Sequence, residues 1–259
     1  VRVIFEDGRM YKAEIIGSDQ LTDIGLVKIE SNNLTPIAIG NSDILVVGDL
    51  AVAIGHPLTL GAAPTVTTGI VSALERRLDV GGQDMSSSVT LFGLIQTDAP
   101  ITRGSSGGAL LNQNGELIGI TTAIATADVG AEGLGFAVNI NLALNISQDL
   151  LDDGKVYHSF LGILGAQHFE VAEDGARIFS GVVIQELYGP ANDIYAIGKA
   201  GALPGDIIKK INGKNIKTLD GLISLLRSKK AGDEISIEIT RNGQAIILEF
   251  LLDLRPSDV

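Results

Sequence analysis

The stretch Gln96–Gly119, QTDAPITRGSSGGALLNQNGELIG, decides which fold the sequence encodes. Two serines lie among three glycines, and an apolar run, an Asn-Gly pair and a second apolar run follow. The letters GSSGG fit the G-x-S-x-G turn of α/β-hydrolases, but that turn must lead into a helix. Here it leads into a strand–turn–strand pattern, because Asn-Gly favours the positive φ angles of a tight hairpin. The sequence therefore excludes the α/β-hydrolase arrangement.

The residues of this loop alone leave two interpretations open. One is a Gly/Ser surface loop without chemistry. The other is a trypsin-like nucleophile loop, in which the N–H groups of the nucleophile and of a glycine two residues earlier stabilise an oxyanion. The spacing then selects Ser106 over Ser105 as the nucleophile. Gly107 and Gly108 would let the chain pass behind it without a Cβ clash.

Short apolar runs separated by Gly, Asn, Asp or Pro surround the loop. Strands at this spacing, without helices between them, predict an antiparallel barrel or sandwich. Asp7-Gly8 predicts a hairpin turn between the first two runs. The expected strands are Val1–Phe5, Met10–Ile16, Gly25–Ile29, Leu50–Ile54, Val66–Ser72, Val89–Ile95, Ala109–Leu111, Glu116–Thr121 and Leu134–Val138.

The pattern changes at residue 139, where a helix is expected. Asn139 or Asn141 can cap its start and Gly154 suits its end. Its apolar residues repeat at helical spacing, and they are Leu142, Ile146, Leu150 and Leu151. The segment 152–159, DDGKVYHS, is expected to be a linker.

The second part of the chain, from about Phe160 to Leu254, mixes strands with helices. A helix over Leu219–Lys230 is predicted with Thr218 as its cap and Gly232 as its stop. The other expected elements are strands over Gly181–Leu187 and Ile207–Ile211, a short helix over Ala191–Lys199, and a hairpin of Glu234–Arg241 and Gln244–Leu251 across Asn242-Gly243.

Composition excludes several classes of function. Hydrophobic residues make up 45% of the 259 residues, which is enough for a substantial core. The net charge is −12, and because nucleic acids and anionic membranes demand a basic face, neither is an expected partner. The chain has no cysteine, so disulfides and thiolate metal sites are excluded. No metal-ligand cluster and no phosphate-binding G-x-x-x-x-G-K-[ST] motif occurs, so no metal, ATP or other cofactor is expected.

Several motifs in one order point to a family. They are TDIGLVKI (Thr22–Ile29), VGDLAVAIGHP (Val47–Pro57), TTGIVSAL (Thr67–Leu74), the serine loop through ITTA, and GLGFAV. Together they closely resemble the HtrA family of trypsin-like serine proteases. In the second part, FLGI (Phe160–Ile163), GALPGDIIKKINGK and the helix at Leu219–Lys230 resemble the PDZ domain that follows the protease domain in that family.

The resemblance implies a mostly β fold, with a trypsin-like double β-barrel whose first barrel is incomplete at residues 1–154 and an α+β PDZ domain at 160–255. Ser106 matches the nucleophile and Asp23 the triad aspartate. Gly104 and Ser106, with Ser105 between them, match the oxyanion hole. Ile124 and Leu134 fall where the family lines its primary specificity pocket, although core packing explains them nearly as well. The family usually has Asn in place of Ser105.

The triad histidine is the part of the resemblance that this chain does not match. Its three histidines are His56, His158 and His168, and none falls at the position of the base. The resemblance puts that position before Val1. Two explanations stay open: the sequence is part of a longer protein, or the chain cannot perform the chemistry. The intact motifs around Ser106 and Asp23 favour the first.

A PDZ domain captures the C-terminus of a peptide by adding it as a strand to a sheet edge. The resemblance makes Leu161, Gly162 and Ile163 candidate donors to the peptide carboxylate. Leu222 and Leu226 would line the pocket for the last side chain, with ordinary core packing as the alternative for each.

The resemblance implies an ATP-independent serine endopeptidase that acts on unfolded or misfolded proteins in protein quality control. It also implies a location outside the cytoplasm, in the periplasm, the cell envelope or the secreted fraction, and assembly as a homo-oligomer, typically a trimer. The alternative function is a catalytically inactive peptide-binding or scaffold protein that keeps the protease fold.

Overall fold

The computed structural model describes residues 1–56, 63–80, 89–124, 134–189 and 194–256. The chain divides into two compact units, Val1–Val156 and Tyr157–Val259. The division falls inside the segment 152–159 that the sequence predicts as a linker. Among the described residues, no helix has the length and apolar character needed to cross a membrane.

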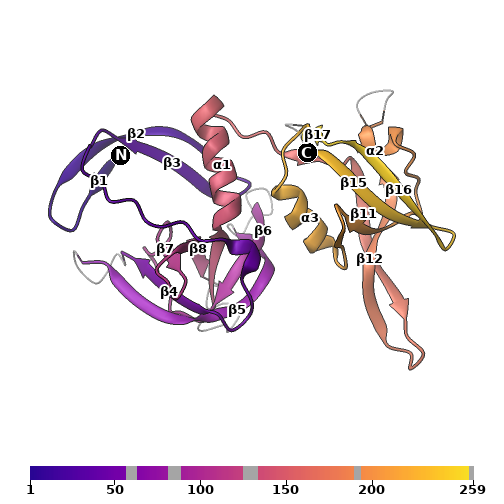
Figure 1. Ribbon diagram of the computed structural model, residues 1–259, viewed down its shortest axis with the longest axis horizontal. Helices are drawn as coiled ribbons and strands as arrows, with labels where there is room; N and C mark the ends of the chain where they lie inside the picture. Colours follow the sequence, from indigo (N-terminus) through magenta and orange to yellow (C-terminus); the bar gives the residue numbers. More distant parts are fainter. Residues whose placement is uncertain (57–62, 81–88, 125–133, 190–193, 257–259) are drawn as a thin grey trace. The chain divides into compact units, whose positions relative to one another are not determined.

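Unit 1 begins with a three-stranded antiparallel sheet of β1 (Arg2–Ile4), β2 (Met10–Asp19) and β3 (Ile24–Ile29), in that order. The predicted Asp7-Gly8 turn joins β1 to β2. In this turn the N–H of Gly8 donates to the carbonyl of Phe5 at 3.0 Å. Figure 1 shows this sheet as a curved ribbon beside the barrel that follows.

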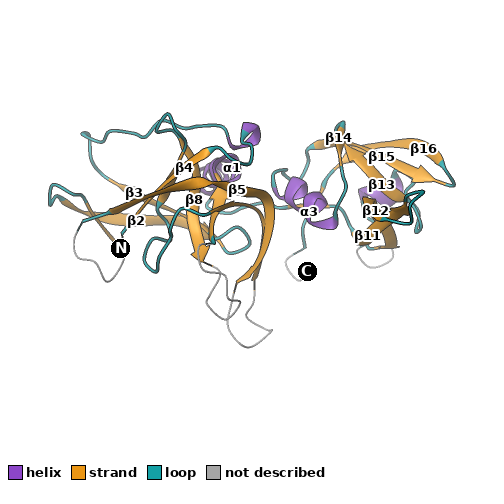
Figure 2. Ribbon diagram, turned by 90° about the horizontal axis from the view of Figure 1, so that it is seen from below, coloured by secondary structure: helices purple, strands orange, loops and turns teal. Residues whose placement is uncertain are grey.

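The rest of unit 1 is a closed barrel with the strand order β4-β5-β6-β9-β8-β7 (Figures 1 and 2). Because β7 pairs with β4, each described strand of this barrel has a neighbour on both sides. Its interior is filled by small and branched apolar side chains, among them Ala51, Val71 and Leu110, which are fully buried. The strands are β4 (Leu50–Gly55), β5 (Thr65–Val80), β6 (Val89–Thr97), β7 (Ala109–Leu111), β8 (Leu117–Ile124) and β9 (Gly135–Asn139), and a short 3-10 helix, η1 (Ser42–Ile44), precedes them.

The helix α1 (Ile140–Asp153) follows the barrel and ties the two parts of unit 1 together. It contacts β2 and β3 of the sheet as well as β8 and β9 of the barrel (Figure 1). Asn139 rather than Asn141 caps it, since its side chain accepts from the N–H of Leu142. The buried face holds Leu142, Ile146 and Leu150, whereas Leu151 is exposed.

Unit 2 is built on one antiparallel sheet in the order β11-β12-β13-β15-β16, with β14 on β13 and a separate pair of β10 and β17. Its core is mostly isoleucine and leucine from the sheet and the helices. The elements are β10 (Ser159–Phe160), β11 (Ile163–Val171), β12 (Arg177–Leu187), α2 (Ala196–Lys199), β13 (Ile207–Ile211), β14 (Lys214–Asn215), α3 (Leu219–Arg227), β15 (Glu234–Arg241), β16 (Gln244–Leu251) and β17 (Asp253–Leu254).

Several element predictions differ from the structure: the strands expected at Met10–Ile16 and Gly181–Leu187 are longer, and run over Met10–Asp19 and Arg177–Leu187. The strand expected at Val66–Ser72 extends to Val80 and pairs with β6 across several register shifts. The α3 helix ends at Arg227 instead of Lys230, because the hydroxyl of Ser228 donates to the carbonyl of Leu225 and closes the last turn. The strand β11 was not predicted. The first residues of the helix expected over Ala191–Lys199 lie outside the described residues, and α2 covers Ala196–Lys199.

Candidate active site

The serine loop lies between β6 and β7 and is folded into tight turns. The N–H of Ser105 donates to the carbonyl of Thr102 at 2.9 Å, and the N–H of Gly108 donates to the carbonyl of Ser105 at 3.0 Å. Gly104 and Gly107 have φ angles of 95° and 84°, a conformation that side-chain-bearing residues rarely adopt. The glycines of the motif therefore set the shape of the loop.

Strand β8 holds this loop from behind. The N–H of Gly107 donates to the carbonyl of Thr121 at 2.6 Å, and the N–H of Thr121 donates to the carbonyl of Gly108 at 2.9 Å. The hydroxyl of Thr121 adds a third bond, to the carbonyl of Ser105 at 2.5 Å. Because Thr121 is only 1% exposed, these bonds are shielded from water.

Ser106 and Asp23, which match the nucleophile and the triad acid, both bond to Thr122, the residue of β8 that follows Thr121. The exposed Ser106 donates its hydroxyl to the carbonyl of Thr122 at 2.6 Å. The Thr122 hydroxyl in turn donates to the Asp23 carboxylate. Asp23 lies in the turn between β2 and β3 with a φ of 60°, which Asp tolerates better than most residues. Residues far apart in sequence, one from the sheet and one from the barrel, are thus brought to Thr122.

The amides of the loop offer two donors to a negatively charged oxygen. Among the residues that the structure describes, no acceptor is recorded for the N–H of Gly104 or of Ser106, whereas the N–H of Ser105 is bonded to Thr102. Of the three predicted oxyanion residues, Gly104 and Ser106 therefore have amides that can bind an oxyanion. The amide of Ser105 is already bonded, and Ser105 only joins the other two.

The three histidines lie outside the serine loop and β8. His56 is exposed directly after β4. His158 and His168 belong to unit 2, where His158 forms a β-bridge with Lys230 and the Nδ1 of His168 lies 2.7 Å from the hydroxyl of Ser180. In the described part of the chain, no histidine is hydrogen-bonded to Ser106 or Asp23.

The residues expected to line the specificity pocket lie where the end of β8 meets the start of β9. Ile124 ends β8 and is paired with Gly135, the first residue of β9, while Leu134 directly precedes it. The side chain of Ile124 lies outside the described residues. Leu134 is half-buried and its covered part packs against the apolar cluster of unit 1.

A cavity of about 330 Å³ beside Asp23 was not anticipated from the sequence. Its walls combine residues from the β2–β3 turn with the ends of β5 and β6, which are Gln20, Asp23, Val80, Val89 and Leu91. Because valine and leucine form most of this wall, the space suits an apolar group. The described residues contain no cluster of His, Asp or Glu that could hold a metal ion.

In unit 2 the predicted carboxylate loop joins β10 to β11. Gly162 has a φ of 73°, and a Cβ there would lie 2.5 Å from the ring of Tyr195. No acceptor is recorded for the N–H of Leu161 or Gly162 in the described ranges, and Ile163 begins β11 at the edge of the sheet. These amides can receive an anion.

The two leucines of α3 differ in burial. Leu222 is 2% exposed and belongs to the core, whereas Leu226 is half-buried beside it. Leu226 is therefore the residue of this pair that can line a pocket.

Thr121 and Thr122 are the site residues that sequence reasoning missed. They appear in the sequence only as two adjacent threonines in the apolar strand GITTA. Which polar group each one meets depends on how the loop and the β2–β3 turn pass over β8.

Two family profiles match the chain. The profile described as trypsin-like peptidase domain matches residues 1–120, and the profile described as PDZ domain matches residues 162–251. Each profile covers most of one unit.

Curated relatives match along nearly the whole chain. The periplasmic pH-dependent serine endoprotease DegQ of Escherichia coli strain K12 is 41% identical, with 99% of this chain and 54% of the relative covered. The periplasmic serine endoprotease DegP of the same strain is 38% identical, with 95% and 50% covered. The chain thus spans about half the length of the curated relatives it matches.

Solved structures agree with the sequence comparisons. The HtrA-type protease AlgW with a tripeptide has a TM-score of 0.72 and 37% identity, covering 98% of this chain and 81% of that one. The same protease with a decapeptide has a TM-score of 0.69 and 36% identity, covering 98% and 75%.

Proposed function

The chain belongs to the HtrA family of trypsin-like serine proteases that carry a PDZ domain, and on that premise we propose that it acts as an ATP-independent serine endopeptidase on unfolded polypeptides. The observation that carries the proposal is the convergence of Ser106 and Asp23 on Thr122, beside the available amides of Gly104 and Ser106.

In the proposed reaction, the hydroxyl oxygen of Ser106 attacks the carbonyl carbon of the substrate. The electron pair of the carbonyl moves to its oxygen, and the N–H groups of Gly104 and Ser106 stabilise that negative charge. Collapse of the tetrahedral intermediate expels the amine and leaves an acyl-enzyme, which water then hydrolyses. In the structure the Ser106 hydroxyl donates a hydrogen bond to the carbonyl of Thr122. The side chain must rotate away from this bond before it can react.

The proposed triad needs a histidine to take the proton of Ser106 and return it to the leaving amine. From the resemblance we propose that this histidine lies ahead of Val1 and that none of His56, His158 and His168 takes the role. Asp23 would accept a hydrogen bond from it and stabilise its cation. The Thr122 hydroxyl supports the proposal, because it holds the Asp23 carboxylate in one orientation.

In unit 2 we propose that a peptide C-terminus adds as a strand to the free edge of β11. The amides of Leu161, Gly162 and Ile163 would hold its carboxylate, and Leu226 would line the pocket for its last side chain. The family structures solved with a tripeptide and a decapeptide support peptide binding.

The proposed substrates are unfolded or misfolded proteins with exposed apolar segments. We propose that cleavage follows a small or medium apolar residue of the substrate, whose side chain would occupy a pocket lined by Ile124 and Leu134. We place the protein outside the cytoplasm because several curated relatives are named as periplasmic. A homo-oligomer, such as a trimer, is proposed from the family resemblance.

The experiment is digestion of a permanently unfolded polypeptide by the protein at its natural full length. We expect cleavage without ATP, complete loss in Ser106→Ala, and retained cleavage in the neighbouring control Ser105→Ala. Mass spectrometry of the products should find small or medium apolar residues before the cut. Equal cleavage by the wild type and Ser106→Ala would refute the proposal.

A peptide-binding or scaffold protein is the second candidate. It is favoured by one observation, which is that the Ser106 hydroxyl donates to the carbonyl of Thr122 and is not directed to a base. This function predicts that the same full-length protein binds the unfolded polypeptide and peptide C-termini without cutting either.

A further inference from the structure

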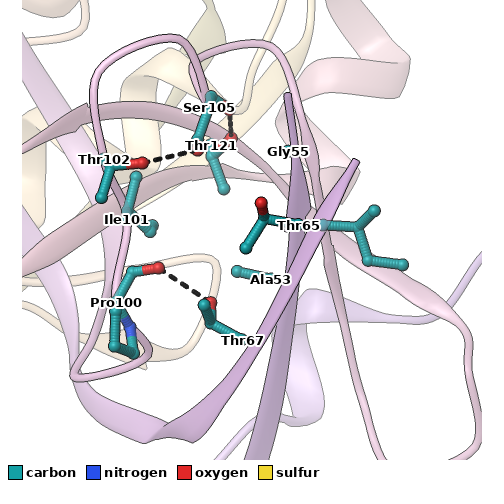
Figure 3. A pocket seen from close by; sticks show the side chains of 10 residues that line it. Ala53, Gly55, Thr65, Thr67, Pro100, Ile101, Thr102, Ser105 and Thr121 are labelled. Carbon is teal, nitrogen blue, oxygen red and sulfur yellow. Dashed lines mark hydrogen bonds between the residues drawn. The ribbon is translucent and has the colours of Figure 1, made fainter. Parts of the chain in front are cut away.

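The peptide unit between Ser105 and Ser106 is held by one buried side chain. The Thr121 hydroxyl donates to the carbonyl of Ser105 at 2.5 Å, and the N–H of Gly108 donates to the same oxygen at 3.0 Å. Figure 3 draws the bond from Thr121 together with the contact of 3.5 Å between the hydroxyls of Thr102 and Ser105. The carbonyl of Ser105 therefore has a fixed direction.

A peptide unit is planar, and in its trans form the C=O and the N–H point in opposite directions. The carbonyl of Ser105 and the N–H of Ser106 belong to the same plane. Any bond that fixes the carbonyl of Ser105 therefore also fixes the direction of the Ser106 amide. In the described residues this amide, like that of Gly104, has no acceptor.

The peptide plane between Ser105 and Ser106 is closely packed on one side. Ser105 is 8% exposed, and a Cβ placed on Gly55 would lie 2.6 Å from the Cβ of Ser105, so the two chain segments are in close contact. A cavity of about 60 Å³ adjoins the contact (Figure 3). Hydroxyl-bearing residues form much of its wall, namely Thr65, Thr67, Thr102, Ser105 and Thr121. The free volume leaves the peptide plane room to shift about its remaining bond from Gly108 when the bond from Thr121 is lost.

We propose that Thr121 is a positioning residue for the oxyanion hole: its hydroxyl holds the Ser105–Ser106 peptide plane so that the Ser106 amide faces the reacting carbonyl oxygen. The inference rests on the proposed peptidase function, since it concerns the geometry of the same site. Thr121 touches no reacting atom and acts through the peptide unit.

The test compares Thr121→Val with Thr121→Ser. Valine has nearly the shape of threonine but no hydroxyl, and the carbonyl of Ser105 keeps its bond from Gly108, so no buried acceptor is left without a partner. Serine keeps the hydroxyl and loses only a methyl group. The pair therefore separates the hydrogen bond from the packing of the side chain.

The expected effect lies on the chemical step. Removing an oxyanion donor outright lowers kcat by about 10²–10³-fold. Loosening one donor should cost less, and we expect kcat to fall on the order of 10-fold in Thr121→Val. KM should stay within about twofold, because the ground-state carbonyl makes little use of the oxyanion hole. In Thr121→Ser both constants should stay within about twofold of the wild type.

The measurement is steady-state cleavage of a fluorogenic peptide with valine before the scissile bond, using the full-length protein. Rates are divided by the number of active sites, which is counted with a fluorophosphonate. This reagent forms a bond from the Ser106 oxygen to phosphorus while fluoride leaves. Its rate of labelling should fall in Thr121→Val in parallel with kcat, since the adduct also places an oxygen in the oxyanion hole. Counting sites removes any loss that arises only from misfolded protein.

Three outcomes would overturn the inference. Equal kcat per site in the wild type and Thr121→Val overturns it while the peptidase function stands. An equal loss in Thr121→Ser and Thr121→Val also overturns it, because packing and not the hydroxyl would then be responsible. A wild-type protein that neither labels nor cleaves overturns the peptidase function and this inference with it.

Discussion

The start of α1 offers a sharp test of how unit 1 is held together. The Oδ1 of Asn139 accepts from the N–H of Leu142 at 2.9 Å and from the hydroxyl of Ser42 at 3.3 Å, and its Nδ2 donates to the carbonyl of Gly93 at 3.1 Å. Substituting Asn139→Ala removes all three bonds. The side chain of Asn141, which the sequence leaves as an equal candidate for the cap, donates to the side chain of Asn41.

The magnitude follows from these bonds. Loss of an N-cap costs about 1 kcal/mol. Each of the other two bonds adds up to about 1 kcal/mol, with less from the long bond to Ser42. We therefore expect Asn139→Ala to lower the free energy of unfolding of α1 by about 2 to 3 kcal/mol. In Asn141→Ala the better helix propensity of alanine, about 0.5 kcal/mol, offsets the lost exposed bond, so the change should be near zero.

The assay is native-state hydrogen exchange of the complete chain, resolved to peptides from α1 by mass spectrometry. A change of 2 kcal/mol corresponds to exchange about 30-fold faster for the protected amides, since 1.4 kcal/mol is about a factor of ten. Asn139→Asp is the matched control, because it keeps the acceptor for Leu142 and replaces the donor to Gly93 with an acceptor. Equal protection in Asn139→Ala and Asn141→Ala would refute the assignment of the cap.

Three further predictions concern unit 2. The Lys209 ammonium, 2.5 Å from Glu170, holds the pKa of that carboxyl below its usual range. The pair therefore stabilises the fold above the unfolded pKa of Glu, and this effect is lost as pH falls through the folded pKa. Lys209→Met should raise the pKa of Glu170 in an NMR titration, and an unchanged pKa would contradict this. Thr218→Ala should destabilise α3 by about 1 kcal/mol because its hydroxyl accepts from the N–H of Gly221, while Thr218→Ser should cost little in urea unfolding. Leu222→Ala should cost about 2 to 5 kcal/mol in the same assay, since the side chain is 2% exposed, and a loss under 1 kcal/mol would contradict its place in the core.

The elements that could be predicted from the sequence are those whose local rules agree with the tertiary fold. The hairpin of Glu234–Arg241 and Gln244–Leu251 matches its prediction at both ends. Its first strand alternates apolar and polar residues, and Asn242 and Gly243 both have the positive φ that a two-residue turn of this kind requires. Local preference alone is sufficient there.

Other strands depend on partners that are distant in sequence. The second half of β5, with the letters ALERRLDV, has no clear alternation, and Glu75 within it has a φ of 56°. Cross-strand bonds stabilise it instead, including those from Arg76 to Gln96 and from Thr90 to Asp79. Likewise β11 contains Gly165 and other weak strand formers and is held by its pairing with β12. Such pairings cannot be read from one segment at a time.

The candidate site divides in the same way. Ser106 and Asp23 were proposed from motifs that each lie within a short stretch of sequence. The roles of Thr121 and Thr122 arise only when the loop and the β2–β3 turn meet on β8, so no local pattern could reveal them.

The identity of the nucleophile is the claim on which the account depends most. A fluorophosphonate added to the full-length protein, followed by peptide mapping with mass spectrometry, tests it directly. The account predicts one adduct per chain on Ser106, retained in Ser105→Ala and absent in Ser106→Ala. An adduct on Ser105, or no adduct on a folded full-length protein, would contradict it.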